Sequence, residues 1–318
     1  MTGAPTGTMP SGRVSDAAEA AAVLGRLPTL AGADCELTVL VGGLTNRNYR
    51  VTTDSGAQFV ARFSSGKSSL LAIDRAAEYR NASIAATAGV APRVVEFAPD
   101  EGVLLVEWIT GRTFTDADLD DAGNLAQVAG LCRRLHAAEP FAADFDIVAV
   151  QQRYLSAVRE FGFRRPDDYL DLEPAVRRVA AALRASALAP VPCHNDLLAA
   201  NILDDGARLW FIDFEYAGNN DPCFELGNLW SEAALGVDRL EHLVACYFGA
   251  PSPVQLARAR LFATLAKYCW TLWASIQAAV SDVDFDFWEW GLEKYTRARA
   301  ELRDPALDHL ISTVSESI

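Results

Sequence analysis

The residues best suited to chemistry lie in one segment, residues 194–218, which reads HNDLLAANILDDGARLWFIDFEYAG. Its His194, Asp196 and Asn201 follow the pattern H-x-D-x-x-x-x-N, and Asp213 ends an apolar run twelve residues after Asn201. Transfer of a phosphoryl group to an alcohol needs a carboxylate that takes the hydroxyl proton, and we assign this role to Asp196. The reaction also needs hard oxygen ligands for Mg²⁺, which Asn201 and Asp213 supply. The pattern therefore predicts phosphoryl transfer, with loop capping as the alternative, and His194 is expected mainly to be a buried histidine bonded to the backbone.

The elements that must position this segment follow from the hydrophobic pattern. Strands are predicted at about 36–42, 48–53, 57–63, 93–97 and 102–108, with a helix at 74–88 between the third and fourth. An amphipathic helix precedes them, with Asp16 as its N-cap and a stop at Pro28. From Thr113 onward the spacing predicts helices at about 116–138, 151–161, 172–187, 221–248, 253–280 and 284–302, apart from a short β-rich segment between Val191 and Asp213.

The predicted fold class is α+β, with a small β-rich N-terminal lobe and a large, mostly helical C-terminal lobe. We expect a cleft between the two lobes, because ligand sites favour such junctions. The predicted divisions are a disordered tail at 1–14, a nucleotide-binding lobe at 15–110 and a catalytic and substrate-binding lobe at 111–318.

Composition narrows the choice of partners. The chain has 318 residues, 51% of them hydrophobic, and a net charge of −14 with no basic block. Nucleic acid and anionic membranes are therefore poor partners, whereas a small cation would be attracted, although charge alone decides little. The apolar runs are too short to span a membrane, and the first dozen residues lack the features of a signal peptide. The six scattered cysteines form no zinc or disulfide pattern, so we expect a cytoplasmic protein, and the oligomeric state is open, with a homodimer among the options.

Residues 42–51, GGLTNRNYRV, join the first two predicted strands. On its own this stretch is typical of a hairpin turn, since it lacks the third glycine of the usual nucleotide loop. Its place in a lobe that accompanies a complete catalytic loop favours a loop that covers nucleotide phosphates. The predicted phosphate contacts are Gly43, Thr45, Asn46 and Asn48, although Asn46 has the alternative role of stabilising the turn.

The small lobe also supplies candidate groups for the rest of the nucleotide. Arg62 occupies the strand position from which a kinase presents a basic side chain to the α- and β-phosphates, and Glu78 on the next helix could hold it as an ion pair. The alternative for both is an ordinary surface charge. The segment GVLLVEWITGRTF is predicted to bind adenine through backbone groups at about Glu107 and Ile109.

These motifs together resemble the choline/ethanolamine kinase family, within the protein-kinase-like fold that also contains the aminoglycoside phosphotransferases. The resemblance runs through residues 42–51, HNDLLAANIL (194–203), IDFEYAGNNDPCFELGNLWSE (212–232) and WTLWASIQAAVSDVDFDFWEW (270–290). The catalytic loop alone fits any relative of this fold, whereas IDFEYAG and W-x-x-W followed by DFDF are more specific to the choline and ethanolamine branch. The resemblance implies a two-lobed protein-kinase-like fold, ATP and Mg²⁺ as cofactors, Asp196 as base, and Asn201 and Asp213 as metal ligands.

The resemblance also implies where a substrate lies. Trp270, Trp273 and Trp290 match an aromatic pocket, Glu232 matches an acidic residue near the ammonium group, and Asp196 contacts the substrate hydroxyl. A quaternary ammonium has no N–H to donate, so aromatic faces and a nearby carboxylate suit it. The alternative is that these tryptophans belong to the packed core between helices. For a fourth tryptophan of this segment, Trp288, we favour that packing role. The chain departs from the family in Glu225, where an Asp is usual, and in Trp290, where a tyrosine is common, and the role of Glu215 is open.

The function that follows is ATP- and Mg²⁺-dependent phosphorylation of the hydroxyl of choline, with ethanolamine as the near alternative. A second hypothesis is another small-molecule kinase of this fold, acting on an aminoglycoside, a thiamine-like compound or homoserine. A third is a nucleotide-binding pseudokinase without chemistry, which the presence of Asp196, Asn201 and Asp213 disfavours.

Overall fold

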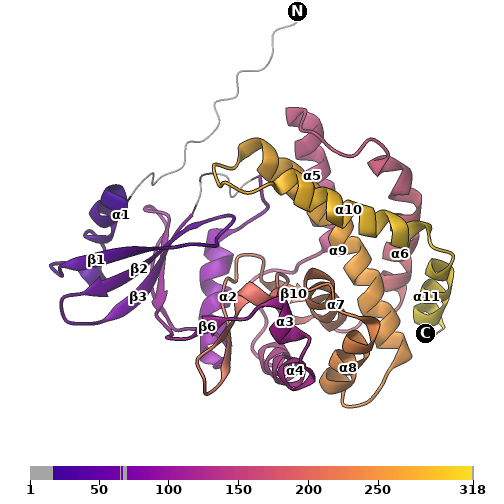
Figure 1. Ribbon diagram of the computed structural model, residues 1–318, viewed down its shortest axis with the longest axis horizontal. Coiled ribbons are helices and arrows are strands. Elements are labelled where there is room, and N and C mark those ends of the chain that lie inside the picture. Colours follow the sequence, from indigo (N-terminus) through magenta and orange to yellow (C-terminus); the bar gives the residue numbers. More distant parts are fainter. Residues whose placement is uncertain (1–16, 65, 67–69, 317–318) are drawn as a thin grey trace, which may run out of the picture. The chain divides into compact units, whose positions relative to one another are not determined.

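The computed structural model describes residues 17–64, 66 and 70–316, and the chain splits into two compact units (Figure 1). The first, here called the sheet unit, comprises Met1–Leu71 and Val94–Trp108. The second, the helical unit, comprises Ala72–Arg93 and Ile109–Ile318. The predicted tail and Asp16 lie outside the described residues. The division at 110 and 111 stays a prediction, and the structure groups the helix of residues 75–87 with the helical unit.

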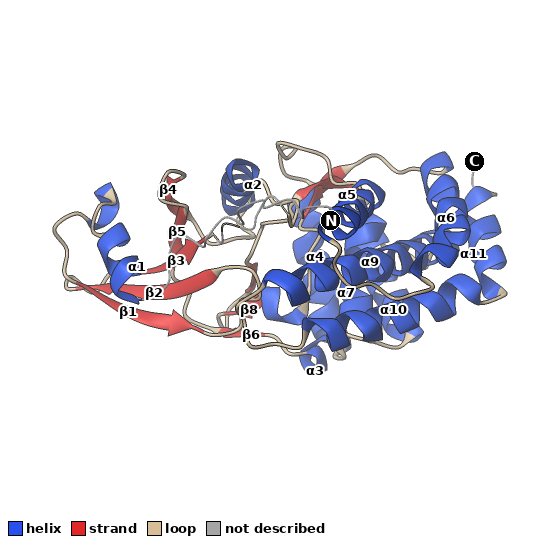
Figure 2. Ribbon diagram, turned by 90° about the horizontal axis from the view of Figure 1, so that it is seen from above, coloured by secondary structure: helices blue, strands red, loops and turns tan. Residues whose placement is uncertain are grey.

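The sheet unit is a single antiparallel sheet with the strand order β1-β2-β3-β5-β4 (Figure 2). Tyr49, Val51 and Thr53 alternate with less buried neighbours along β2, because successive side chains of a strand point to opposite faces. Helix α1 packs on the buried face through residues such as Leu24. The strands are those predicted, with slightly different ends: β1 (Cys35–Leu40), β2 (Arg47–Thr53), β3 (Gln58–Phe63), β4 (Val94–Ala98) and β5 (Val103–Glu107), preceded by α1 (Ala17–Leu24) and the 3-10 turn η1 (Pro28–Leu30).

The helical unit is built around one long helix, α9, which packs against α10, α7 and α5 (Figure 1). Almost every residue of its second half is buried, including polar ones such as Lys267 and Gln277, so other parts of the chain cover this half on all sides. The helices are α2 (Arg75–Thr87), α3 (Asp116–Leu119), α4 (Ala122–His136), α5 (Ile147–Phe161), α6 (Glu173–Ala185), α7 (Pro222–Glu232), α8 (Val237–Phe248), α9 (Pro253–Val280), α10 (Phe287–Arg303) and α11 (Ala306–Ser315).

Short strands and 3-10 turns carry the segment with the predicted catalytic residues. Strand β7 pairs with β10, and β6, β8 and β9 form a second small sheet. Their bounds are β6 (Arg112–Thr113), β7 (Val191–Cys193), β8 (Ile202–Asp204), β9 (Leu209–Phe211) and β10 (Gly218–Asn220), with η2 (Tyr169–Leu172) and η3 (Ala199–Asn201).

Two glycines let neighbouring helices approach α9 closely. A Cβ atom built on Gly227 of α7 would lie 2.1 Å from the carbonyl oxygen of Ala259. A Cβ atom built on Gly291 of α10 would lie 2.5 Å from the Cβ of Ala274. Neither contact leaves room for a methyl group, so glycine at these two positions sets the spacing of α7 and α10 from α9.

The prediction of one helix over 221–248 is wrong. Helix α7 ends at Glu232, Ala234 adopts a left-handed conformation with φ of 50°, and Gly236 precedes the first residue of α8. The prediction of one helix over 116–138 is also wrong, because the Asp121 side chain accepts a hydrogen bond from Asn124 N and starts a new helix there. Helix α11 was not predicted.

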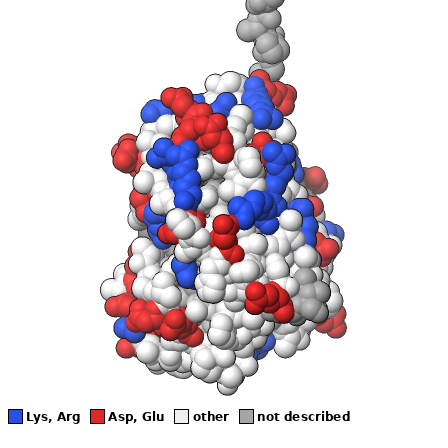
Figure 3. All heavy atoms as spheres, turned by 90° about the vertical axis from the view of Figure 1, so that its right-hand side faces the viewer, with Lys and Arg blue, Asp and Glu red and all other residues white. Residues whose placement is uncertain are grey.

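The described surface carries charges of both signs. On the face drawn in Figure 3, basic and acidic side chains are interspersed, with uncharged surface between them. Within the described part of the chain, the helices are either too short or too polar to cross a membrane.

Candidate active site

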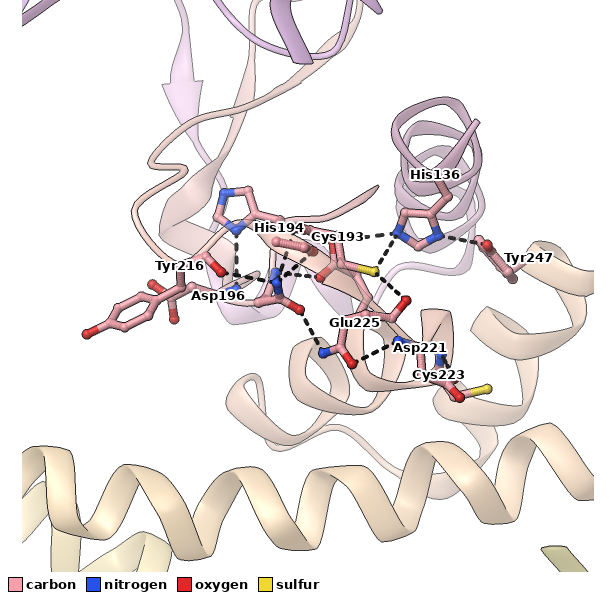
Figure 4. Close-up of polar contacts among 12 residues, drawn as sticks. His136, Cys193, His194, Asp196, Tyr216, Asp221, Cys223, Glu225 and Tyr247 are labelled. Atoms are coloured by element: carbon pink, nitrogen blue, oxygen red, sulfur yellow. Dashed lines mark hydrogen bonds and ion pairs between the residues drawn. The ribbon is translucent and has the colours of Figure 1, made fainter. Parts of the chain in front are cut away.

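The loop of residues 194–201 begins with a backbone held by a carboxylate. Glu225, in the first turn of α7, accepts hydrogen bonds from His194 N at 2.8 Å and Asn195 N at 2.7 Å (Figure 4). Asn195 has a left-handed φ of 64°, and its side-chain amide bonds three backbone carbonyls, those of Cys193, Tyr216 and Gly218. Asparagine tolerates this conformation better than most residues. Asp196 therefore follows a turn that is held both by the Glu225 carboxylate and by the Asn195 side chain.

Glu225 is fully buried, and a second group faces it. His136 Nε2 lies 3.8 Å from Glu225 Oε1, and His136 Nδ1 lies 2.7 Å from the Tyr247 hydroxyl (Figure 4). Burial alone would raise the pKa of Glu225, but interactions with His136, His194 and the Asn195 N–H hold it below its ordinary value. Glu225 therefore carries its charge at neutral pH.

His194 links the start of the loop to the segment before Asp213. Its Nε2 lies 2.8 Å from the Ile212 carbonyl oxygen, which can only accept, so Nε2 carries the proton. Its Nδ1 then accepts from Asp196 N at 3.3 Å. His194 is buried and bonded to the backbone, as expected from the sequence.

Asn201 and Asp213 lie together and suit a hard cation. Ile212 N donates to Asn201 O at 3.0 Å, which joins the two segments. The Asn201 Nδ2 donates to the Asp196 carbonyl at 2.8 Å, so its Oδ1 faces the other way and is available as a ligand. Asp213 has a left-handed φ of 71°, an uncommon conformation for a residue other than glycine. An amide oxygen and a carboxylate fit Mg²⁺, which takes one or two protein oxygens and completes its shell with phosphate and water.

Asp196 lies in an acidic environment. Burial raises the pKa of its carboxyl well above the usual range. Three neighbouring carboxylates raise the pKa further and the Lys294 ammonium opposes them; the carboxylates are those of Asp213, Glu215 and Glu232. The carboxyl is therefore a stronger proton acceptor than an exposed aspartate, and a cation at Asp213 would counter the repulsion.

Glu215 and Glu78 share an arginine. Arg75 Nη1, on α2, lies 2.8 Å from Glu78 Oε2 and 3.2 Å from Glu215 Oε2. The proposed pairing of Glu78 with Arg62 stays a prediction, and Arg75 is a partner that sequence reasoning missed. Its i, i+3 spacing from Glu78 on one helix was the available signal.

The tryptophans of residues 270–290 connect with the loop. Trp270 Nε1 donates to Asn228 Oδ1 at 3.1 Å, and Asn228 Nδ2 donates to the Leu197 carbonyl at 3.3 Å. Trp273 Nε1 donates to the Tyr216 hydroxyl at 3.0 Å, and its ring meets that of Trp290 edge to face at 5.5 Å. The structure thus brings the three predicted tryptophans into one aromatic segment that adjoins loop 194–201.

Glu232 has an internal cation as its partner. Lys294 Nζ lies 2.6 Å from Glu232 Oε2 and 4.1 Å from the centre of the Trp290 ring. The lysine side chain is 3% exposed and that of the glutamate 11%. Sequence reasoning missed Lys294, although its i, i+4 spacing from Trp290 places both on one face of α10.

All but one of the predicted nucleotide residues of the sheet unit lie in or beside the β1–β2 loop, the exception being Glu107. Asn48 on β2 is directly opposite Arg62 on β3, so their side chains share a face. A Cβ atom on Gly43 would lie 2.9 Å from Asn46 O and 3.1 Å from Asn48 Nδ2, which requires glycine there. Thr45 lies in the same loop, Glu107 ends β5 opposite Phe59, and Ile109 and Glu78 belong to the helical unit.

Comparison with known proteins shows which family shares this arrangement. A model of the phosphotransferase enzyme family matches residues 36–262. The crystal structure of a choline/ethanolamine kinase family protein from Mesorhizobium loti is 31% identical, with a TM-score of 0.81 over 94% of this chain and 99% of that one.

Two curated relatives match in sequence. Protein LicA of Haemophilus influenzae is 29% identical over 74% of this chain and 72% of its own length. Ethanolamine kinase 2 of Mus musculus is 34% identical over 33% of each chain. The predicted α+β, two-lobed, protein-kinase-like fold is confirmed. The chain belongs to the phosphotransferase enzyme family and, within it, to the choline/ethanolamine kinase family.

Proposed function

We propose that the protein transfers the terminal phosphoryl group of ATP, with Mg²⁺, to the hydroxyl of a small amino alcohol, choline or ethanolamine. The observation that carries this proposal is the pair of hydrogen bonds by which Asn228 joins loop 194–201 to Trp270. The loop with the residues that suit a hydroxyl and a metal ion is thus joined to the indole rings that, with the Glu232 carboxylate, suit an ammonium group. Membership of the choline/ethanolamine kinase family supports the same substrate class.

Asp196 is the proton acceptor of this reaction. The substrate hydroxyl donates a hydrogen bond to its carboxylate, and the hydroxyl oxygen attacks the terminal phosphorus of ATP. As the new oxygen–phosphorus bond forms, the proton passes to Asp196 and the bond to ADP breaks. The raised pKa of Asp196 favours this transfer, because it strengthens the base.

Other residues of the chain bind and orient the reactants. Asn201 and Asp213 would hold Mg²⁺, which would neutralise charge on the phosphates. The nucleotide contacts come from the β1–β2 loop, the basic strand residue and its carboxylate partner, and the backbone after β5: Gly43, Thr45, Asn46, Asn48, Arg62, Glu78, Glu107 and Ile109. The substrate cation is received by Trp270, Trp273, Trp290 and Glu232.

A substrate panel tests the proposal. The purified protein is given Mg²⁺-ATP with choline, ethanolamine, homoserine, thiamine or kanamycin, and ADP release is followed by a coupled assay. We expect turnover with an amino alcohol that disappears when EDTA removes Mg²⁺. A family member that turns over choline or ethanolamine is run alongside. If it is active and this protein phosphorylates neither amino alcohol, the proposal fails.

A further inference from the structure

A buried lysine occupies part of the site that should receive the substrate cation. Lys294 Nζ is bound to Glu232 Oε2 at 2.6 Å and lies over the Trp290 ring at 4.1 Å. A carboxylate and an indole face are the two groups expected to recognise an ammonium ligand. Lys294 therefore neutralises Glu232 and covers one of the three aromatic faces before any substrate binds.

The choice of lysine here is unusual for this chain. Only three of its 28 basic residues are lysines, and two of the three, Lys267 and Lys294, are buried in the helical unit. An ammonium is a compact charge with three donors, whereas a guanidinium is planar and larger. The position thus holds a group with the same chemistry as a primary ammonium.

The second oxygen of Glu232 remains an acceptor. Glu232 Oε1 is buried and has no hydrogen-bond partner among residues 17–64, 66 and 70–316. A buried charged acceptor gains most from a ligand that donates an N–H to it. A quaternary ammonium has no such hydrogen and would cover Oε1 without bonding it.

The group formed by Glu232, Lys294 and Trp290 is connected to the residues assigned to catalysis. Trp290 meets Trp273, which donates to the Tyr216 hydroxyl, and the Tyr216 carbonyl accepts from Asn195 beside Asp196. The charges of both Glu232 and Lys294 also act on Asp196. A two-carbon amino alcohol that reaches Asp196 with its hydroxyl therefore has its ammonium end toward Glu232.

We propose that Lys294 is a specificity residue that makes the site select an ammonium carrying at least one N–H, so that ethanolamine is preferred to choline. This inference rests on the proposed function. The remaining faces of Trp270 and Trp273 attract either cation, so they do not separate the two substrates. The free oxygen of Glu232 does separate them. Because Lys294 neutralises the charge of Glu232, this carboxylate binds a ligand mainly through a hydrogen bond to Oε1, and a site with a buried acceptor rejects an analogue that lacks the donor.

The first test uses the wild-type protein and four alcohols: ethanolamine, its N-methyl and N,N-dimethyl derivatives, and choline. The first three retain an N–H as ammonium ions, and choline does not. We expect similar kcat/KM for the first three and a fall of about tenfold or more at the last methyl group. A gradual change across the series, equal values for all four, or a preference for choline would overturn the proposal.

The second test removes the lysine. In Lys294→Met, the full charge of Glu232 and the Trp290 face become available to a cation with or without an N–H, so we expect the choline to ethanolamine ratio of kcat/KM to rise about tenfold. Lys267→Met is the matched control, since Lys267 is also buried, with Glu301 at 3.0 Å and Trp230 at 5.7 Å, and its loss should leave the ratio unchanged.

The outcomes separate the two proposals. An unchanged ratio in a folded Lys294→Met protein, or an equal change in Lys267→Met, refutes the role of Lys294. If the Met variant does not fold, the wild-type methyl series still decides. Absence of turnover with all four alcohols contradicts the proposed function itself.

Discussion

Helix α7 carries two carboxylates with different surroundings. Glu225, in its first turn, accepts one backbone N–H on each oxygen and is fully buried. Glu232, seven residues later on the same face, bonds Lys294 through Oε2, while its Oε1 has no hydrogen-bond partner in the described part of the chain. Glu225 has no oxygen left for a ligand, whereas Glu232 has one.

The difference separates two regions with different tasks. The backbone of loop 194–201 adopts an uncommon conformation at Asn195, and the Glu225 carboxylate serves to hold it there. In the aromatic segment, tryptophan rings lie beside the Glu232–Lys294 ion pair, and the Glu232 carboxylate can take part in binding the substrate. If the comparison is right, changes near Glu225 should affect kcat and stability, and changes near Glu232 should affect KM for the amino alcohol.

The largest expected effect is on Asp196, in the first region. Asp196→Asn removes the proton acceptor, and we expect kcat to fall by about 10³-fold, within the usual range for a lost general base. The variant should remain folded, because it removes a charge from among other carboxylates. Affinity for an ATP analogue, measured by calorimetry, should be retained.

The control for this variant is Asp205→Asn. Asp205 is a half-buried residue between β8 and β9 that accepts a hydrogen bond from Trp210 Nε1. It has no assigned role in catalysis or binding, so the substitution should leave kcat unchanged. A normal rate in Asp196→Asn would refute the assignment of the base.

The next effect concerns the carboxylate that holds the loop. In Glu225→Gln one amide nitrogen must face a backbone N–H, and we expect the free energy of unfolding to fall by about 3 kcal/mol. kcat should fall while KM for the amino alcohol changes little. Urea denaturation measures the first and steady-state kinetics the second, with the exposed Glu241→Gln as control.

The same variant has a pH signature. The pKa of Glu225 is lowered in the folded protein, so its contribution to stability is present above its unfolded value, 4.5, and is lost as the pH falls through the folded value. The stability difference between wild type and Glu225→Gln should therefore shrink in acid. A difference that grows on acidification would contradict the charged state of Glu225.

Sequence reasoning reaches furthest where the proposed site depends on local spacing. Asp196, Asn201 and Asp213 could be singled out because the residues that surround them in sequence also surround them in space. The anchor Glu225 was noted only as a departure from the family, since its partners His194 and Asn195 are about 30 residues away. The pairing of Glu232 with Lys294 spans 62 residues and depends on how closely α7 and α10 approach α9. Spacing along the chain carries no information about that distance.

A change at the α9–α10 contact should disturb the aromatic segment alone. The added methyl group of Gly291→Ala would meet Ala274 at 2.5 Å, so α10 must shift and carry Trp290 and Lys294 with it. We expect about 2 kcal/mol of destabilisation and a raised KM for the amino alcohol, with KM for ATP unchanged.

Gly130→Ala in α4 is the control for this contact. The nearest atom that its methyl group would meet is Arg133 Nη2 at 3.8 Å, so the substitution should stabilise the helix instead. If Gly291→Ala leaves stability and both KM values unchanged, the close approach of α10 does not set the pocket.

The smallest effect separates one tryptophan of the pocket from one outside it. Trp273→Phe keeps an aromatic face but loses the hydrogen bond to the Tyr216 hydroxyl, which should cost about 1 kcal/mol and raise KM for the amino alcohol several-fold. Trp288→Phe is the matched change, because Trp288 stacks on Arg164 and its Nε1 has no acceptor within the described residues. It removes no hydrogen bond, so KM should stay at the wild-type value. Equal effects on KM from the two variants would mean that the hydrogen bond of Trp273 does not orient the pocket, and that the boundary drawn between pocket and packing tryptophans is misplaced.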